Sequence, residues 1–600
     1  MKQAVISFIK YYLFWTAYFV AQKPLFMIWQ NDLIGNVNWT DWLLVPFHGL
    51  PLDLSVAAYI TVFYGLILSV RYFISQKALR IVQDIYTGLV LFIVTLVVIS
   101  DNACFPSWGY HLDKDIFDYL ATPKEVLACA LWWQWLAGIT GTIIVFGVWW
   151  LIYCFLFPKY QTWTNGTTKS RFFGTIGSVL LTALLFLPIR GSLTVSTMNT
   201  GRVYYNSNRM LNIAAINPVF NIVESLSENH LNSSRYHYMP SEQVQEIYSI
   251  NHGSSQSTER LFTTTHPNIV LVILESFSKN AIFAMPQLQR FIQEGIYFSN
   301  VYANSYRTDR GVMAVLGAYP GCAMTSIMTI PSKSASLPQI GQVLKSEGYN
   351  LKFYYGGDED FTNMRSYLIT GGFEQRICDH DFPISNRMSK WGVPDHVLFD
   401  YAAKDIVARH TASNTPQFDV ILSLSSHEPF DVPFHHFEDI YVNAIGYTDS
   451  CLGAFIDTLQ HSAIWDSTVV VMVADHGYPY PRGIHNYDTL RYAIPLVMIG
   501  GAIKQQREIK TLCSQIDWVP TMLHQMELSA EQFIYAKDIL DTTITPYAYY
   551  HFVDGFALKT EDGTTIIDAV TNETIFETNS DTLRAKKARA ITQKIYEDIN

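Results

Sequence analysis

A chain of 600 residues is too long for one hydrophobic core, and a composition that is 49 % hydrophobic and 14 % aromatic is too apolar for a wholly soluble protein. The formal net charge of −11, without any cluster of Lys and Arg, excludes nucleic acid as a partner. The long apolar runs fall before residue 190, so a membrane part is predicted to precede a soluble part. The seven cysteines form no CxxC pair, and we predict no disulfide.

Five stretches before residue 190 are long and apolar enough to cross a bilayer. A membrane-spanning helix needs about 20 mostly apolar residues to cross about 30 Å of hydrocarbon. The predicted spans cover residues 5–28, 53–73, 83–100, 131–156 and 172–190. The first span carries Lys10 and Lys23, each near an end from which a long side chain can reach the interface. A cleaved signal peptide is the alternative for this stretch, but it lacks a small-residue cleavage site and four more spans follow.

Charged residues in the connections predict the orientation of the spans, because Lys and Arg are retained on the cytoplasmic side. The basic residues after the second and fourth spans are Arg71, Lys77, Arg80, Lys159, Lys169 and Arg171. The connection between the third and fourth spans is acidic and holds Asp101, Asp113, Asp115 and Asp118. The N-terminus is therefore predicted inside, and the chain after Arg190 on the extracytoplasmic side of a bacterial cytoplasmic (inner) membrane.

The chain changes character after this five-helix transmembrane domain, which covers residues 1–190. Residues 191–265 are polar, with Asn- and Ser-rich pieces at 232–235 and 254–257 around an amphipathic stretch near 213–226. This composition predicts a partly helical linker.

Residues 266–540 carry the pattern of an α/β domain. Residues 268–274 form a continuous apolar run, typical of a strand buried on both faces of a parallel sheet. Further β-rich runs lie at 418–424 and 468–474. The candidate helices between the runs lie at 288–294, 337–347, 397–409 and 444–461. Strands that alternate with helices predict a doubly wound sheet, in which ligands bind beyond the carboxyl ends of the strands.

Residues 541–600 are predicted to form a C-terminal strand/helix subdomain that packs on the catalytic domain. They contain β-rich runs at 547–552 and 564–567, followed by a charged helix over 581–599. No motif for chemistry lies in this segment.

Two of the buried runs end in residues that bind metals. Glu275 follows the run 268–274, and Asp475 and His476 follow the run 468–474. The carboxylates and the imidazole are expected to meet at one edge of the sheet. This donor set suits one divalent cation, Zn²⁺ or Mn²⁺, with Mg²⁺ as a further candidate.

A polar segment between these motifs contains a candidate nucleophile. Residues 304–311 precede a helical stretch of small residues at 312–316. The hydroxyl of Thr308, at a helix N-terminus and beside a metal, could attack phosphorus and could also bind the metal once deprotonated. A Thr at such a place is more often a helix cap, so this segment alone leaves both roles open.

The three motifs, in this order, resemble those of lipoteichoic-acid-synthase-like phosphoglycerol transferases, which belong to the sulfatase family of the alkaline phosphatase superfamily and are related to phosphoethanolamine transferases. Five spans before an outside catalytic domain is the same layout, so the resemblance covers almost the whole chain. In that family the Glu of an LES motif, a loop Thr and the Asp-His of a DH motif bind one Mn²⁺ or Zn²⁺. The matching residues here are Glu275, Thr308, Asp475 and His476.

The resemblance also implies substrate contacts. His427 lies in a segment, 423–430, similar to the family stretch T-x-x-H-x-P-[FY], whose His contacts the substrate phosphate. A buried neutral His is the alternative. Residues 355–365 match the family's G-x-x-x-F-x-N region in part, but Thr-Asn-Met stands where Gram-positive synthases have Trp-Asn-Arg. The candidate contacts in this region, or else surface turn residues, are Asp358, Asn363 and Arg365.

Three further residues complete the predicted substrate site. His485 follows the DH motif, at a place where relatives have a His that lines the pocket. Arg307 and Arg310 flank Thr308 and could hold phosphate by forked hydrogen bonds, or could be solvated.

These inferences predict a membrane-anchored phosphotransferase. Thr308 would attack the phosphorus of a phospholipid carrying a phosphoglycerol or phosphoethanolamine head group, releasing diacylglycerol, and an envelope glycan or lipid hydroxyl would then take the group from the phospho-Thr enzyme. A phosphodiesterase or phosphatase, in which water resolves the intermediate, is the alternative. A sulfatase is a further rival, although no cysteine begins the C-x-P-x-R motif of such enzymes. A catalytically inactive module is disfavoured because all four predicted ligands are present.

Overall fold

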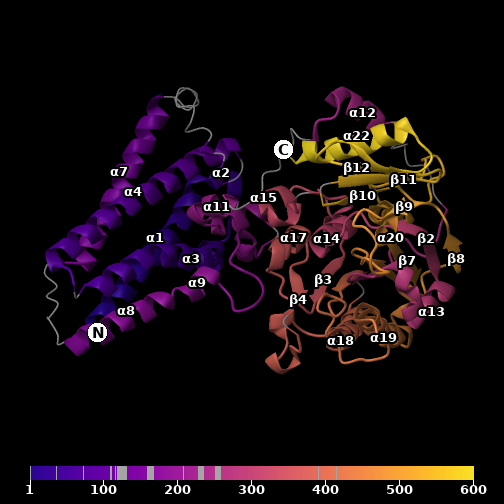
Figure 1. Ribbon diagram of the computed structural model, residues 1–600, viewed down its shortest axis with the longest axis horizontal. Coiled ribbons are helices and arrows are strands. Elements are labelled where there is room, and N and C mark those ends of the chain that lie inside the picture. The colour runs from indigo at the N-terminus through magenta and orange to yellow at the C-terminus, as the bar shows by residue number, and fades with distance from the viewer. Residues whose placement is uncertain are drawn as a thin grey trace. The chain divides into compact units, whose positions relative to one another are not determined.

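The computed structural model describes residues 2–599 apart from 36, 72, 109–110, 115, 118–131, 159–167, 207, 227–235, 250–258, 324, 390, 414 and 554. Asp115, Asp118, Lys159 and the polar pieces at 232–235 and 254–257 therefore lie outside the described residues. The chain divides into two compact units, Met1–Glu228 and Asn229–Asn600 (Figure 1). The boundary falls inside the segment predicted as a linker.

Long apolar helices dominate the first unit, as predicted. Its main helices are α1 (Lys2–Trp29), α3 (Asp41–Val70), α4 (Gln76–Trp108), α7 (Trp132–Leu156), α8 (Thr168–Ala183) and α9 (Phe186–Arg190), with the short α2 (Asn31–Ile34) after α1. Among the described residues, five helical stretches have the length and composition of membrane spans: Gln3–Trp29, Asp41–Val70, Gln76–Pro106, Trp132–Leu156 and Arg171–Arg190. Each covers most of a predicted span.

Lys23 does not reach an interface, contrary to the prediction. Its side chain is buried, and Nζ lies 2.6 Å from Asp53 Oδ1, so α1 and α3 share an internal ion pair. Asn217 Nδ2 donates to the same carboxylate oxygen at 2.9 Å. A charge among apolar helices is costly unless it is paired, and here the pairing replaces exposure.

The chain after α9 folds back onto the spans of its own unit. It forms η1 (Thr200–Val203), α10 (Arg209–Ala215) and α11 (Pro218–Ser225). Asn217 caps α11 by accepting from Val219 N and Phe220 N. The predicted amphipathic stretch is therefore two short capped helices anchored through Asp53.

A mixed sheet forms the centre of the second unit. Its order is β4-β3-β5-β1-β6-β7-β2-β8, and β9 pairs with β2. The strands are β1 (Asn268–Leu274), β2 (Ile296–Tyr302), β3 (Asn350–Tyr355), β4 (Gln375–Ile377), β5 (Gln417–Leu422), β6 (Thr468–Ala474), β7 (Ala493–Ile499), β8 (Arg507–Ile509) and β9 (Cys513–Ser514). The strands from β4 to β6 are parallel, whereas β7 runs antiparallel to β6 and β2. The central strands are buried along their length, as their apolar runs predict.

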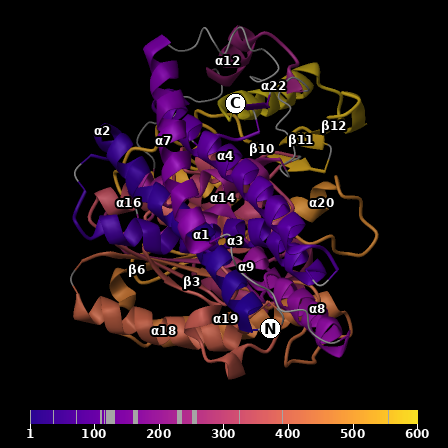
Figure 2. The ribbon, with the colours of Figure 1, turned by 90° about the vertical axis from the view of Figure 1, so that its left-hand side faces the viewer.

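Helices cover both faces of this sheet. Helices α18 (Asp395–Ala412) and α19 (Ile440–Gln460) lie together along one side, and α14 (Thr308–Gly317) lies on the other (Figure 1, Figure 2). The other helices of the unit are α12 (Ser241–Ser249), α13 (Pro286–Glu294), α15 (Pro331–Ser334), α16 (Ile340–Ser346), α17 (Met364–Thr370), α20 (Thr489–Tyr492) and α21 (Trp518–Gln525). All four candidate helices of the sequence are present, in α13, α16, α18 and α19.

The C-terminal segment forms a second sheet closed by a helix. Its antiparallel strands follow in order: β10 (Tyr547–Phe552), β11 (Gly555–Thr560), β12 (Thr564–Asp568) and β13 (Thr574–Glu577). Helix α22 (Thr582–Asp598) packs against β11 and β12. Asn304 Nδ2 donates to Tyr549 O, and His551 N donates to Asn304 O, both at 2.9 Å. Strand β10 therefore supports the loop that leads to Thr308.

Candidate metal and nucleophile site

The register of two neighbouring strands brings the predicted metal ligands together. Strands β1 and β6 pair in parallel, with Leu274 opposite Ala474. Glu275 and Asp475 are the next residues on each strand, so both carboxylates emerge at the same edge of the sheet. His476 follows directly, and the three buried side chains place ligand atoms within 4.8 Å of one another.

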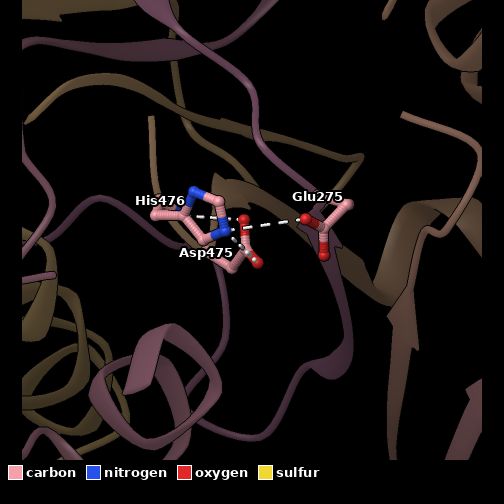
Figure 3. A group of neighbouring side chains, drawn as sticks. All are labelled: Glu275, Asp475 and His476. Atoms are coloured by element: carbon pink, nitrogen blue, oxygen red, sulfur yellow. Dashed lines mark hydrogen bonds and ion pairs between the residues drawn. The ribbon is translucent and has the colours of Figure 1, made fainter. Parts of the chain in front are cut away.

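Figure 3 shows this group, in which the imidazole of His476 faces both carboxylates. His476 Nε2 lies 3.6 Å from Glu275 Oε1 and 3.5 Å from Asp475 Oδ2. Thr308 adjoins the group, because its Oγ1 donates to Glu275 Oε2 at 2.9 Å. The four residues that the sequence proposes as a metal and nucleophile set therefore lie in one place.

Thr308 is the first residue of α14 rather than part of a loop before it. Arg307 is the N-cap residue, and its extended backbone turns the chain into the helix. The Thr308 hydroxyl makes no side-chain cap: it points to Glu275. The alternative that Thr308 serves as a helix cap finds no support in this geometry.

A tight turn after β1 fixes the direction of Glu275. Ser276 has φ of 59°, a left-handed conformation that is uncommon for residues other than glycine. Its backbone N–H donates to Asp475 Oδ1 at 2.8 Å, and its Oγ donates to Glu275 Oε1 at 2.8 Å. Tyr441, from α19, donates its hydroxyl to Ser276 O at 2.8 Å. These bonds compensate the strained turn and hold both carboxylates.

Close backbone approach holds α14 against the end of β6. A Cβ added to Gly311 would lie 2.3 Å from Asp475 O, a distance that no packing tolerates. Gln515 Nε2 donates to the same carbonyl at 2.7 Å. The glycine three residues after Thr308 therefore sets the separation between the nucleophile helix and the Asp475 strand end.

Burial disfavours the charged forms of all three side chains. Burial, together with the charge of Asp475, raises the pKa of Glu275 to about 7. Burial likewise raises the pKa of Asp475 to about 7 and lowers the pKa of His476. Asp475 Oδ2 is buried without a hydrogen-bond partner.

These observations fit a divalent cation. Two carboxylates, an imidazole and a hydroxyl are ordinary ligands for Zn²⁺ or Mn²⁺, and a cation would both balance the charge and satisfy Asp475 Oδ2.

The structure places His427 close to this group, and Trp391 lies over it. His427 follows β5, and its charge acts on the carboxylate of Glu275. Its ring is half-buried against Trp391, with the centroids 4.2 Å apart. Trp391 Nε1 donates to Glu428 O at 2.7 Å, which fixes the indole over the histidine. The buried-histidine alternative therefore does not describe His427.

The segment around residues 358–365 makes mainly internal contacts. Arg365 pairs with Glu359 at 2.8 Å and with Asp360, so its charge is compensated away from the metal group. Asn363 Nδ2 donates to Thr329 O at 2.8 Å. Burial, together with the charges of Glu275 and Asp358, raises the pKa of Tyr355.

The predicted arginines differ in their surroundings. Arg307 is exposed, whereas Arg310 is buried, with Nε donating to Cys322 O at 3.1 Å. The guanidinium groups of Arg310 and Arg491 lie 5.3 and 5.6 Å from the centre of the Tyr306 ring. The charge of Arg491 also helps to lower the pKa of His476, after burial, so a second arginine adjoins the site.

His485 stacks on an aromatic ring of its own segment. It is exposed and stacks on Tyr487, with the ring centroids 4.9 Å apart.

Sequence reasoning missed Tyr441, Trp391, Arg491 and Gln515. Each comes from a loop or helix without a motif, and only the tertiary fold brings it to the site. The one local signal in the sequence concerned another feature: a glycine, Gly311, stands three residues after the candidate nucleophile and could have indicated the close backbone approach there.

Comparisons with known proteins agree with this architecture. Residues 267–528 match the sulfatase family model. "Phosphoglycerol transferase I" from Xanthomonas campestris pv. campestris (strain B100) is 23 % identical over 313 residues, which cover 47 % of this chain and 44 % of that protein. The match thus spans less than half the length of this relative.

Two solved structures share the fold. A protein of the alkaline phosphatase superfamily from Vibrio parahaemolyticus has a TM-score of 0.54 at 23 % identity, covering 61 % of this chain and 98 % of its own. The lipoteichoic acid synthase LtaP from Listeria monocytogenes has a TM-score of 0.51 at 19 % identity, covering 60 % and 98 %.

Residues 267–528 are therefore similar to the sulfatase family model and share the fold of these two structures, and five candidate membrane helices precede them in the chain.

Proposed function

We propose that this protein is a membrane-anchored phosphotransferase that uses Thr308 as its nucleophile. The observation that carries the proposal is the hydrogen bond from Thr308 Oγ1 to Glu275 Oε2, which places a helix-start hydroxyl against the buried carboxylate and imidazole group. Its domain 266–540 would perform the chemistry on the extracytoplasmic side of a bacterial cytoplasmic membrane.

Glu275, Asp475 and His476, joined by Thr308, would hold one divalent cation, Mn²⁺ or Zn²⁺, with Mg²⁺ as a third candidate. When bound, such an ion lowers the pKa of a hydroxyl and stabilises negative charge on phosphoryl oxygens.

Individual residues of the chain are assigned to the steps of the reaction. Thr308 Oγ1 passes its proton to the Glu275 carboxylate and attacks the phosphorus of a phospholipid, so that the bond from phosphorus to the diacylglycerol oxygen breaks. His427, with its ring accessible, protonates the departing alkoxide. A hydroxyl of an envelope glycan or lipid then passes its proton to His427 and attacks the phospho-Thr, and the released Thr308 oxygen takes its proton back from Glu275. We propose His427, Arg307, Arg310, Asp358, Asn363, Arg365 and His485 as substrate contacts, and we add Trp391 and Arg491 to them.

The donor head group is proposed as phosphoglycerol or phosphoethanolamine. The rival is a hydrolase of the same fold, in which water attacks the phospho-Thr. The two differ only in the acceptor, so a product analysis distinguishes them.

The test is a transfer assay with the full-length protein in lipid vesicles that contain labelled phosphatidylglycerol or phosphatidylethanolamine and a hydroxyl-bearing glycolipid. We expect diacylglycerol release with the label on the glycolipid, and a rate lower by at least about 1,000-fold in Thr308→Ala, the scale typical of a lost nucleophile. Label only in free head group would identify the hydrolase. Equal rates in wild type and Thr308→Ala would refute the role of Thr308.

A further inference from the structure

We propose that an exposed aromatic patch on the rim of the site docks on the surface of the bilayer and delivers the lipid donor to Thr308. The patch consists of Phe283, Phe437, Ile440, Tyr480 and Leu490. This inference rests on the proposed function, because it states how a phospholipid reaches that same site.

Three segments that are distant in sequence converge in the patch. The ring of Phe283 lies 6.5 Å from that of Phe437 and 6.2 Å from that of Tyr480, measured between centroids. Asn280 Nδ2 donates to Tyr480 O at 3.0 Å and to Leu490 O at 2.8 Å. The patch is therefore built by fixed contacts.

The apolar side chains of the patch face water. Phe283 is 56 % exposed, Ile440 54 %, Leu490 49 % and Phe437 38 %. Burying such a side chain fully is worth roughly 1.5–3 kcal/mol, and contiguous exposed apolar surface marks places where a protein meets a partner or a membrane.

The patch is continuous with the site. Phe283 belongs to η3 (Lys279–Ala284), which begins four residues after Glu275, and Tyr480 lies four residues after His476. Tyr441 joins the two regions, because its ring lies 5.8 Å from Tyr480 while its hydroxyl binds Ser276 O. A lipid whose acyl chains lay on the patch would present its head group to the catalytic group.

The bilayer is the occupant that the molecule favours. Five candidate spans in the same chain keep a membrane within reach of the second unit. Phe, Tyr and long aliphatic side chains are the residues that lie at the boundary between head groups and acyl chains. Arg482 flanks the patch with 72 % of its side chain exposed, and its Nε pairs with Asp439 Oδ2 at 3.3 Å.

The first test reads lipid contact without any need for activity. Benzoylphenylalanine at position 283 or 437 of the full-length protein, in nanodiscs of phosphatidylglycerol and phosphatidylethanolamine, is irradiated and the lipid adducts are measured by mass spectrometry. Position 384 is the matched control, because Ile384 is apolar, 82 % exposed and lies just beyond the edge strand β4, at the end of the sheet away from β7. We expect several-fold more lipid adduct at 283 and 437 than at 384. Equal labelling, or adducts with another protein instead of lipid, would overturn the proposal.

The second test separates docking from chemistry. In the double variant Phe283→Ser/Phe437→Ser, turnover of the long-chain donor in vesicles should fall at least tenfold, while cleavage of a water-soluble phosphodiester and the Tm stay as in Ile384→Ser. Equal losses on both substrates would contradict docking. If wild type turned over neither substrate but lipid adducts still formed at 283 and 437, the proposed function would fail while the docking surface stood.

Discussion

At the scale of single residues, the candidate metal group depends on side chains that stand directly after buried strands. Glu275 and Asp475 follow paired positions of β1 and β6, so the parallel register brings their carboxylates together. Arg365 shows the limit of such inference. Its match to a family motif did not reveal that Glu359 and Asp360 compensate its charge.

The buried carboxylates predict an unusual pH dependence of stability. Their folded-state pKa values, about 7 for both Glu275 and Asp475, lie above the unfolded values, so the metal-free protein binds more protons when folded. Their contribution is fully present below about pH 4 and is lost as pH rises through about 7.

Thermal unfolding of chelator-treated protein between pH 5 and 8 measures this effect. We expect Tm to fall by several degrees as pH rises, and the fall to shrink when Mn²⁺ or Zn²⁺ is added. Asp475→Asn should flatten the metal-free profile. A metal-free wild-type Tm that falls with pH no more steeply than the Tm of Asp475→Asn would contradict the account.

At the scale of elements, the apolar runs predicted the central strands and their burial, but they did not predict where α14 begins. The sequence placed its helical stretch at 312–316, whereas the helix begins at Thr308. What sets this start is tertiary: the approach of Gly311 to Asp475 O and the support of Asn304 by β10.

Gly311→Ala tests whether this approach positions the nucleophile. A Cβ would meet the carbonyl of Asp475 at 2.3 Å, so α14 must shift, at a stability cost of about 1–3 kcal/mol. Activity should fall at least about 100-fold, since small displacements of reacting groups cost that much. Gly453→Ala on α19 is the control, because its Cβ meets only the flexible side chain of Gln287. Equal effects of the two variants on activity would argue against a positioning role.

The ion pair between α1 and α3 makes a prediction about the membrane unit. Lys23→Met leaves Asp53 buried without its cation, which typically costs 3–5 kcal/mol. Tm of the full-length protein in detergent should drop markedly, and Lys23→Met/Asp53→Leu should recover part of the loss. If the stability loss of Lys23→Met/Asp53→Leu equalled the sum of the losses of the two single variants, the two residues would not act as a pair.

At the scale of the whole molecule, hydropathy was enough to separate the unit with candidate membrane spans from the α/β unit. Long apolar runs predict the spans, and short apolar runs predict the buried strands. The position of the boundary was not predictable. Residues 191–265 were predicted as a linker, yet Asn217 bonds to the buried carboxylate of Asp53, and Asn221 Nδ2 donates to Leu112 O, so this part of the chain folds onto the first unit. The periodicity of apolar residues does not indicate such a tertiary contact.

The most direct test of the central claim is peptide mapping of the full-length protein after acid quenching during turnover of labelled phosphatidylglycerol or phosphatidylethanolamine. The account predicts a glycerophosphoryl or ethanolaminephosphoryl group on Thr308, with the mass naming the donor, and no adduct in Thr308→Ala. Sustained turnover with no adduct on Thr308, or with the adduct on another residue, would contradict it.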